Sequence, residues 1–522
     1  MNKGALPMEQ KKVGFASGIG FILAAAGSAI GLGNLWAFPY KTSANGGAAF
    51  VILYIASVLF IGLIVTMCET FIGKRAQANP ISAYKKVHKN VGWFGMLAIA
   101  LPTIIICYYS VLGGYTVKFT LNSFVGNAGV FNSFAGNIGD VLMYTAIFII
   151  LSLMIVLAGV KNGIEKASKV LMPALFLILT GIVVFSLFLG EGVKDGLEFY
   201  LKPDFSELTW TSVLAAMSQA FFSLSLGMGI MITYGSYSGK EINLVKSTIM
   251  ICIFDTVVAL LAGLAIFPAV FHYAATAGIP YSELGMGGIG LLFQTLPYVF
   301  ADMGILGQIV SLLFFAMVTI AAMTSVISLI EVATQFVIQK FHTKRKVAAV
   351  AVGSVCFAVA IPVSISLGKV LNGDNSMVIF GQNWLDFLDL MTNTVLMPVG
   401  AFLACLAVGW IIGIKKTCNE IEQQGTKLGA FRPVFSIMAK FVTPLLILVV
   451  EIFGCFDLIM PMGENGRSFS GNGLGIVACS YGLLALCLIV YFIFFRNTET
   501  GTNEDEHIVD WEEMVDQSNA AK

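Results

Sequence analysis

The sequence predicts an all-α membrane protein with twelve transmembrane helices, and three observations support this fold class. Of the 522 residues, 57% are hydrophobic and only 11% are charged, whereas soluble domains carry about 25% charged residues. Apolar runs long enough to cross a bilayer recur twelve times along the chain. The loops between them alternate between rich and poor in Lys and Arg, as expected of a chain that crosses a membrane repeatedly and contacts its lipid.

The expected spans follow from the limits of the apolar runs. They are 15–41, 45–73, 92–124, 140–160, 167–188, 211–239, 242–275, 301–339, 347–366, 380–413, 433–461 and 474–496. Many exceed the roughly 20 residues that a bilayer requires, which predicts helices that are tilted or extend beyond the membrane.

The charge of the loops predicts the orientation of the chain. Most loop Lys and Arg residues fall in one alternate set of loops, while 125–139 and 276–300 contain none. The positive-inside rule places the basic loops, the N-terminal segment 1–14 and the acidic tail 497–522 in the cytoplasm, in a multi-pass protein of the cell membrane. The loop at 189–210 is then extracellular, and the Gly-rich segment 276–300 is expected to fold over an extracellular opening.

Several other functional classes find no support in the composition. The net charge is zero, which gives no indication of a nucleic-acid partner. The nine cysteines are scattered without the CxxC or Cys/His spacing of a metal site, so small buried hydrophobic residues are the expected interpretation. The sequence offers no nucleophile–base set, and no enzymatic activity is predicted.

The first span contains an unusual stretch, GSAIGLGNLWAFPY, at 27–40. Its three glycines, Gly27, Gly31 and Gly33, each disfavour a helix by about 1 kcal/mol relative to alanine, and Asn34 and Pro39 follow. Irregular backbone at membrane depth is tolerated only where it is buried in protein or lines a cavity. Two interpretations are open: the freed carbonyls and N–H groups bind a cation and an anion, or the small residues allow close helix packing.

The sixth span repeats this pattern in SLSLGMG at 223–229. Ser223 and Ser225 stand beside Gly227 and Gly229, although serines in membrane helices also bond to their own backbone carbonyls. The two interrupted spans are five apart, and an odd repeat length makes two copies enter the membrane in opposite senses. That is the arrangement of transporters built from inverted repeats.

Two further sets of residues are candidates for ion binding. Ala321, Thr324 and Ser325 share one helix face, and their carbonyl and hydroxyl oxygens are hard ligands that suit Na⁺; ordinary polar packing is the alternative. Ionisable residues at membrane depth are functional candidates by default. Four occur here: Glu69, Asp255, Glu331 and Glu451.

Together these stretches closely resemble the neurotransmitter:sodium symporters. The motifs are GxAxGLGNxWxFPYxxxxNGGAAF at 27–50, SQAFFSLSLGMG at 218–229 and AxxTS at 321–325, and the bacterial amino-acid branch typified by the leucine transporter is the best match. The resemblance implies a five-plus-five inverted repeat, formed by 15–188 and 211–413, with unwound helices 1 and 6. It also implies two extra C-terminal helices in 433–496 and sodium-coupled transport by alternating access.

The resemblance assigns residues to two sodium sites and a substrate site. One sodium site comprises Gly27, Ile30, Ala321, Thr324 and Ser325, the first two through their carbonyls. The other comprises the carbonyl of Ala29 with Asn34, Ser223, Asp255 and the substrate carboxylate. That carboxylate would meet the N–H groups of Leu32 and Gly33 and the hydroxyl of Tyr109. The ammonium would meet Ser223, Ser225 and the carbonyl of Phe222. The side-chain pocket would be formed by Ile105, Phe222, Met228, Ser325 and Leu329.

Three positions narrow the expected substrate. Gly31 stands where amine-transporting members place an aspartate, which favours an α-amino acid. Met228 is flexible and adaptable, which predicts a hydrophobic range that includes Phe, Tyr or Trp. Ala259 lacks the hydroxyl of the family's chloride site, and Asp255, one turn earlier near Tyr54 and Gln219, would supply the negative charge. We therefore expect a chloride-independent symporter of hydrophobic or aromatic α-amino acids.

Other functions and several properties are left open by the sequence. A sodium- or proton-coupled carrier of another amino acid, an amine or an osmolyte is one alternative, and a non-transporting amino-acid sensor is another. The sequence alone does not specify the exact amino acid, the sodium stoichiometry, proton antiport, the oligomeric state or the role of the tail.

The gates depart from the family pattern. At the outer gate the resemblance expects an arginine at Ala37, while its acidic partner is Asp389, with Asp386 nearby; Lys41 is an open substitute for the arginine. At the inner gate Lys12 and Phe15 replace an arginine and a tryptophan, and the expected acid aligns with Gln339. Tyr237 and Glu331 are further inner candidates. Gly163 and Pro173 have the spacing of a hinge in span 5, for which a simple proline kink is the alternative.

Overall fold

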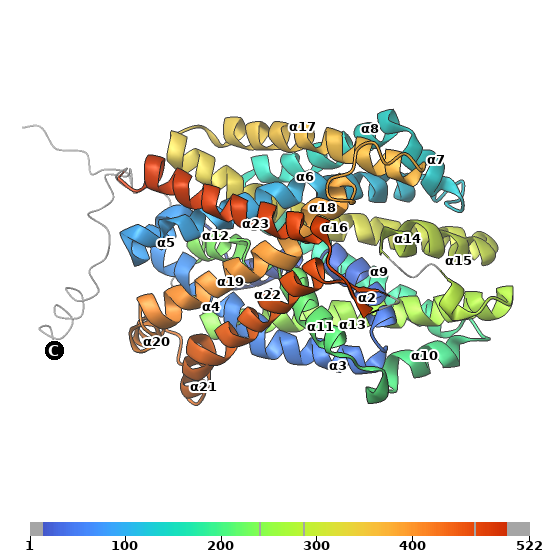
Figure 1. Ribbon diagram of the computed structural model, residues 1–522, viewed down its shortest axis with the longest axis horizontal. Helices are drawn as coiled ribbons and strands as arrows, with labels where there is room; N and C mark the ends of the chain where they lie inside the picture. Colours follow the sequence, from blue (N-terminus) through green and yellow to red (C-terminus); the bar gives the residue numbers. More distant parts are fainter. Residues whose placement is uncertain (1–13, 240–241, 285–287, 464–465, 498–522) are drawn as a thin grey trace, which may run out of the picture.

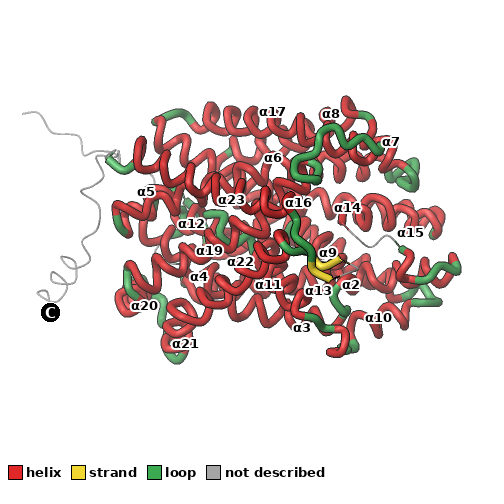
Figure 2. The backbone as a smooth tube through the Cα atoms, viewed as in Figure 1, coloured by secondary structure: helices red, strands yellow, loops and turns green. Residues whose placement is uncertain are grey.

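The computed structural model describes residues 14–239, 242–284, 288–463 and 466–497. Within these ranges the chain is almost entirely helical, apart from a hairpin of two-residue strands, β1 (Met462–Gly463) and β2 (Gly466–Arg467), which pair antiparallel (Figure 2). The candidate gate residue Lys12 and most of the acidic tail lie outside the described residues.

Ten continuous helical segments in the described part are long and apolar enough to cross a membrane. They are Ala48–Ala76 (α3, η2, α4), Lys89–Asn122 (η3, α6), Ile138–Leu157 (α8), Val160–Leu187 (η4, α9), Leu244–Ala277 (α13), Gly304–Phe341 (α16), Arg345–Leu371 (α17), Trp384–Ile411 (α18, η8, α19, η9), Phe431–Ile459 (α21, η10, α22) and Gly471–Phe495 (α23, η11). Their limits agree with the predicted spans to within a few residues, except that span 5 begins earlier, at Val160.

Two further spans are broken. The first consists of α1 (Gly18–Ala29) and the segment η1 (Gly33–Ala37) with α2 (Phe38–Ala44), and the two halves are bent by 48°. The second consists of α11 (Trp210–Ser223) and α12 (Ile230–Ser236), separated by residues 224–229. With the ten continuous spans they make the twelve that the sequence predicts, and the breaks fall at the two predicted stretches.

Short helices occupy the connections. They are α5 (Pro80–Val87), α7 (Val130–Gly136), α10 (Val193–Leu201), η5 (Phe205–Glu207), η6 (Tyr281–Glu283), α14 (Gly288–Gly290), η7 (Leu291–Thr295), α15 (Leu296–Asp302) and α20 (Ile414–Gln423). The predicted loop at 276–300 is therefore largely helical. The indole of Trp36 in η1 donates to the carbonyl of Gly288 over 2.6 Å, which joins this segment to the first break.

The helices run mainly along the long axis of the molecule, and the broken spans lie among the central ones (Figure 1). α1 packs against α9, α13 and α16, and α6 packs against α16. In their most apolar stretches, 78% of the α6 span and 72% of the α16 span are buried, against 28% for the spans of α22 and α23. The interior is therefore built around α1, α6 and α16, while α22 and α23 are peripheral.

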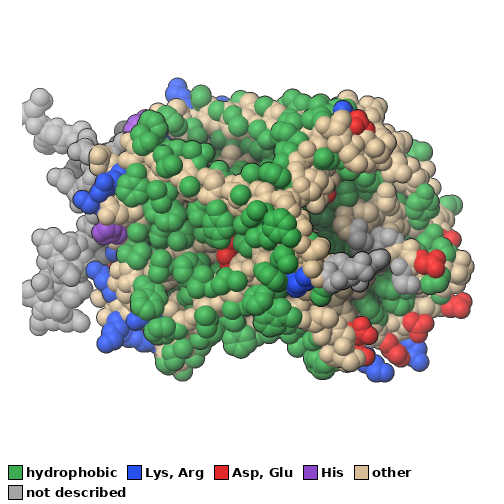
Figure 3. Space-filling view, in the orientation of Figure 1, with side chains coloured by type: hydrophobic (Ala, Val, Ile, Leu, Met, Phe, Trp, Pro, Cys, Tyr) green, Lys and Arg blue, Asp and Glu red, His purple; other side chains and the backbone are tan. Residues whose placement is uncertain are grey.

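Charge divides the surface along the same axis (Figure 3). Lys and Arg gather at the end where α5 and α20 lie, and Asp and Glu gather at the opposite end, near α10 and α15. We call these the basic end and the acidic end. The surface between them is largely apolar, as in the exposed Leu445, Ile452 and Phe456 of α22. This belt is what a multi-pass membrane protein presents to lipid.

Candidate functional site

The first break is shaped by the close approach of two other spans. Ile30 ends α1 in an extended conformation, and the N–H of Gly31 donates to the side-chain oxygen of Asn34 over 3.1 Å. A Cβ built at Gly31 would lie 2.7 Å from the hydroxyl of Tyr109 and would also overlap the hydroxyl of Ser325. Only glycine leaves room for both hydroxyls, so the predicted helix break is also the point of contact with α6 and α16.

The second break depends on left-handed backbone. Ser225, Gly227 and Gly229 have φ angles of 53°, 78° and 68°, a region that glycine adopts at little cost and other residues rarely visit. The backbone N–H groups of Gly227 and Gly229 lie near the carboxylate of Glu69, which is buried in α4 and whose Oε2 has no hydrogen-bond partner among the described residues. Glu69 is one of the predicted membrane-depth acids, and the structure places it beside the backbone freed by this break.

A small central cavity lies between the two breaks, and most of the predicted substrate residues line it. The lining comprises Ala29, Gly31, Gly33, Ile105, Tyr109, Phe222, Ser225, Met228, Ser325 and Leu329. Leu32 joins the same wall, because its N–H donates to the hydroxyl of Tyr109 over 2.9 Å. Ser223 does not line the cavity; its hydroxyl turns toward Asp255.

Asp255 is fully buried beside this cavity and collects donors from three other elements. The side-chain NH₂ of Asn34 donates to Oδ1 over 2.8 Å, and the hydroxyl of Ser223 lies 2.9 and 2.8 Å from Oδ1 and Oδ2. The hydroxyl of Tyr54 donates to Oδ2 over 3.1 Å. We call Asn34, Tyr54, Ser223 and Asp255 the Asp255 cluster. It joins residues that the sequence assigned to one sodium site, and it holds one formal negative charge.

Two other residues named with Asp255 lie near the cluster without joining it. The side-chain NH₂ of Gln219 donates to the carbonyl of Gly33 over 2.7 Å. Ala259 is fully buried one helical turn beyond Asp255 and offers only a methyl group. The position that the resemblance links with chloride therefore has no hydroxyl to bind an anion.

A second set of oxygens lies where α1 meets α16. The hydroxyl of Ser325 lies 3.1 Å from the carbonyl oxygen of Ser28 and 3.5 Å from that of Ile30, and the hydroxyl of Thr324 donates to the carbonyl of Ala321 over 3.0 Å. A Cβ at Gly27 would lie 3.6 Å from Cβ of Thr324, so this glycine also borders the set. These five predicted residues come together. Their neutral carbonyl and hydroxyl oxygens are ligands for an alkali or alkaline-earth cation.

The chemistry of these two clusters narrows the kind of ion they could hold. Within the described ranges, the structure contains no group of three or more His, Cys, Asp or Glu side chains arranged to hold a metal ion. Hydroxyl, amide and carbonyl oxygens with a single carboxylate suit a hard cation of low charge rather than a transition metal.

Asp389, the last residue of α18 (Trp384–Asp389), is held by neighbours that the sequence did not indicate. The hydroxyl of Tyr108 donates to its Oδ1 over 3.0 Å and the side chain of Asn393 over 2.5 Å. Lys41 adds a favourable charge interaction, and Ala37, where an arginine was expected, is buried. Tyr108 precedes Tyr109 directly, and adjacent residues of a helix face different directions. The pair of tyrosines was therefore the available signal that Tyr108 contacts a different part of the fold from Tyr109.

At the basic end, the fully buried Glu331 is paired with Arg345 through both terminal guanidinium nitrogens. The hydroxyl of Tyr237 also donates to Glu331, over 2.7 Å, and the N–H of Phe15 donates to the carbonyl of Tyr237 over 3.1 Å. The structure thus brings together Tyr237, Glu331 and Phe15, which the sequence named as inner-gate candidates. Arg345 entered the sequence interpretation only as a loop charge, since nothing in its surroundings indicated a buried partner.

Two other expected gate features take defined places. The side-chain NH₂ of Asn383 donates to Oδ2 of Asp386 over 2.6 Å, whereas Tyr108 and Asn393 both donate to Oδ1 of Asp389. Gln339 accepts hydrogen bonds from both the backbone and the side chain of Asn79, at 2.9 and 2.7 Å. The amide of Gln339 therefore joins α16 to the start of the connecting helix α5 through neutral hydrogen bonds.

The predicted hinge residues of span 5 lie on either side of a change in helix type. Gly163 is in the wide turn η4 (Val160–Glu165), and Pro173 is inside α9 (Lys166–Leu187). A Cβ at Gly163 would collide with the carbonyl of Ile155. Glycine is therefore required here for close packing, whatever the hinge does.

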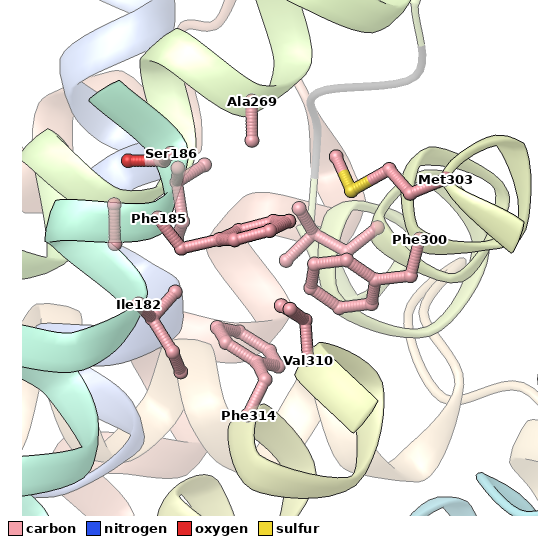
Figure 4. Close-up of a pocket in the computed structure, with 11 residues that line it drawn as sticks. Ile182, Phe185, Ser186, Ala269, Phe300, Met303, Val310 and Phe314 are labelled. Carbon is pink, nitrogen blue, oxygen red and sulfur yellow. The ribbon is translucent and has the colours of Figure 1, made fainter. Parts of the chain in front are cut away.

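A second small cavity lies between α9, α13, α15 and α16 (Figure 4). Phe185, Phe300 and Phe314 face it, and Ser186 is the polar residue among those lining it. The hydroxyl of Ser186 is already engaged with the carbonyls of Val183 and Leu264, at 2.9 and 3.0 Å. This cavity therefore offers apolar packing rather than a polar site that would orient a ligand.

Comparisons with known proteins find relatives over most of the chain. The model of the sodium:neurotransmitter symporter family matches residues 13–130 and 128–499. The uncharacterized sodium-dependent transporter YhdH of Bacillus subtilis is 36% identical over 453 residues, covering 85% of this chain and 97% of that protein. An uncharacterized sodium-dependent transporter of Haemophilus influenzae is 32% identical over 471 residues, covering 85% and 98%. The crystal structure of MhsT in complex with L-phenylalanine matches with a TM-score of 0.76 and 37% identity, covering 85% of this chain and 99% of that one.

Proposed function

We propose that this chain, which belongs to the sodium:neurotransmitter symporter family, carries a hydrophobic or aromatic α-amino acid together with sodium across the cell membrane by alternating access. The observation that carries the proposal is the lining of the central cavity, which combines two kinds of groups. The groups of the first break and the hydroxyl of Tyr109 are polar, and we call them the polar wall; the side chains of Ile105, Met228 and Leu329 are apolar, and we call them the apolar wall. An α-amino acid with an apolar side chain combines polar and apolar groups in the same way.

The polar wall suits a carboxylate. The N–H of Leu32 donates to the hydroxyl of Tyr109, and Gly33 and Tyr109 both line the cavity. A substrate carboxylate, which is a strong acceptor, would accept from the hydroxyl of Tyr109 and from the N–H groups of Leu32 and Gly33. The absence of a side chain at Gly31 keeps this place clear, and an acid in its stead would repel a substrate carboxylate. The carbonyl of Phe222 and the hydroxyl of Ser225 would then accept from the ammonium group.

The apolar wall suits a large side chain. Phe222 offers an aromatic face, and Met228 can change its rotamer to fit ligands of different shape. MhsT, a relative of known structure, was crystallised with L-phenylalanine. We therefore propose a range that includes Phe, Tyr and Trp rather than the smallest amino acids.

Two sodium ions are proposed for the two oxygen clusters. One would lie at the Asp255 cluster and share the substrate carboxylate, with the carbonyl of Ala29 completing its ligands. The other would lie among Gly27, Ile30, Ala321, Thr324 and Ser325. Because one sodium and the substrate share ligands, each raises the affinity for the other. Asp255 provides the negative charge, so chloride is not required.

The two ends of the molecule would open in turn. We propose that Asp389 belongs to the outer closure, and that Phe15, Tyr237 and Glu331 belong to the inner one. The basic end would face the cytoplasm, since Lys and Arg gather there. Unwinding of span 5 between Gly163 and Pro173 would open a path from the second sodium site to the cytoplasm.

Uptake into proteoliposomes tests the proposal. An inward sodium gradient should drive accumulation of labelled L-phenylalanine, and uptake should persist when gluconate replaces chloride. Unlabelled Tyr, Trp and Leu should compete, and Gly should not. Competition by Gly and Ala alone would overturn the proposed substrate range, loss of uptake in gluconate would overturn chloride independence, and binding without uptake would indicate a sensor.

A further inference from the structure

We infer that Glu165 acts as a latch, which means that its carboxylate holds the start of α1 to span 5 at the basic end. In this inference α1 moves only after its hydrogen bonds to the Glu165 carboxylate have broken. The inference rests on the proposed alternating-access function. It concerns a residue that the sequence pattern did not single out, because an acid at the end of a basic loop is ordinarily solvated.

The latch consists of two hydrogen bonds between elements far apart in the chain. Oε2 of Glu165 accepts from the N–H of Ala16 over 2.6 Å, and Oε1 accepts from the hydroxyl of Ser17 over 2.9 Å. Ser17 also caps α1 by accepting from the N–H of Gly20 over 3.0 Å. Glu165 is 1% exposed, so these bonds form away from water. A carboxylate at the N-terminus of a helix is additionally favoured by the helix dipole.

The fit of the carboxylate depends on a glycine. A Cβ built at Gly20 would overlap the carboxyl group of Glu165, whereas one built at Gly18, in the same turn, would meet nothing within 4 Å. The absence of a side chain at Gly20 therefore makes room for the carboxyl group of Glu165. Gly20 is in the first turn of α1, before the first break, and it does not line the central cavity.

The carboxylate also has a partner that does not belong to α1. Nζ of Lys169, one turn further along span 5, lies 2.6 Å from Oε1, and the side chain of Lys169 is 42% exposed. Lys169 can keep Glu165 ion-paired after α1 has left. The hydrogen bonds to α1 can therefore break without leaving the buried carboxylate of Glu165 unpaired.

Few other hydrogen bonds hold this end of α1. Among the described residues 14–20, the remaining hydrogen bond to another element runs from the N–H of Phe15 to the carbonyl of Tyr237. Glu165 also ends η4, the wide turn that contains Gly163. A change in this turn would move the carboxylate, so the start of span 5 and the start of α1 are mechanically joined by one side chain.

Hydrogen exchange of the full-length protein in nanodiscs, in sodium and without substrate, tests the latch. The reporter is a peptide covering residues 18–24. Glu165→Gln should speed exchange of this peptide about tenfold, because amides held only by local structure open more easily. Its matched control is Glu198→Gln, the same change in the exposed Lys194–Glu198 pair of α10, which should leave the peptide unchanged.

A second pair of variants keeps Glu165 in place. Gly20→Ala should displace the carboxylate and speed exchange about tenfold, even though alanine favours a helix over glycine. Gly18→Ala should slow exchange or leave it unchanged. If Gly20→Ala also slowed exchange, or if Glu165→Gln left the peptide as in wild type, the latch would be wrong. Because no substrate is present, this outcome is independent of whether the transport proposal holds.

Discussion

Two buried acids of the predicted gates, Glu331 in α16 and Asp389 at the end of α18, are held in different ways. Glu331 is in direct contact with the guanidinium of Arg345 and accepts from Tyr237. Asp389 accepts from the neutral side chains of Tyr108 and Asn393, and Lys41 contributes through its charge. A buried ion pair is costly to break from one side, whereas neutral hydrogen bonds are exchanged more easily. The comparison indicates that Glu331 is the more firmly held of the two acids.

Removing Arg345 should have the largest effect. Arg345→Ala leaves the fully buried Glu331 without its counter-ion, and we expect a loss of about 3–5 kcal/mol in stability. Thermal unfolding in detergent would show a lower midpoint. The control is Arg432→Ala, whose partner Glu422 has a side chain that is 34% exposed; it should lose at most about 1 kcal/mol. Equal losses of stability in Arg345→Ala and Arg432→Ala would contradict the claim that Glu331 is firmly held by a buried ion pair.

Removing the hydroxyl of Tyr108 should have a smaller effect. Tyr108→Phe takes away one hydrogen bond to Asp389 but leaves the one from Asn393, so we expect a loss of about 1–3 kcal/mol. The same unfolding assay applies, with Tyr298→Phe as the control because that side chain is 47% exposed. A loss as large as that of Arg345→Ala would mean that Asp389 is held as firmly as Glu331.

Replacing each acid by its amide should give the smallest loss of stability at Asp389 and a larger loss at Glu331. Asp389→Asn retains an acceptor for Tyr108 and removes only the charge interaction with Lys41, which makes no direct ion pair with Asp389 in the described part of the chain. Its loss should therefore stay within about 1 kcal/mol. Glu331→Gln leaves the Arg345 guanidinium without its counter-ion and should lose more, about 3 kcal/mol. The difference between the two variants, measured in one detergent, is the quantity of interest; if it were zero, the contrast between ionic and neutral fastening would be wrong.

The sequence could predict the features that depend on residues close together in the chain. The spans follow from apolar runs, and both breaks follow from glycines beside polar residues in otherwise apolar segments. Gly31 is an example: its neighbours indicated a break, and the structure adds that Tyr109 and Ser325 press against it. The motifs also identified most residues that line the central cavity.

Pairings across the fold could not be predicted in this way. Glu165 meets residues that are 149 and 148 positions away, and Tyr108 meets Asp389 across 281 positions. No periodicity connects such positions, because they are joined only by the packing of whole helices. Ala37 shows the same limit: the sequence revealed a missing arginine, but only the structure shows Tyr108 and Asn393 bonded to the remaining acid.

The most direct test of the central claim is the sodium dependence of amino-acid binding. Labelled L-phenylalanine should bind the purified protein at least about tenfold more tightly in sodium than in potassium, because in the proposed function the substrate carboxylate and a sodium ion meet at the Asp255 cluster. Asp255→Ala should remove most of this difference, while Asp374→Ala, an exposed acid paired with Lys369, should keep it. Equal affinity in sodium and potassium, or an undiminished sodium effect in Asp255→Ala, would contradict the account.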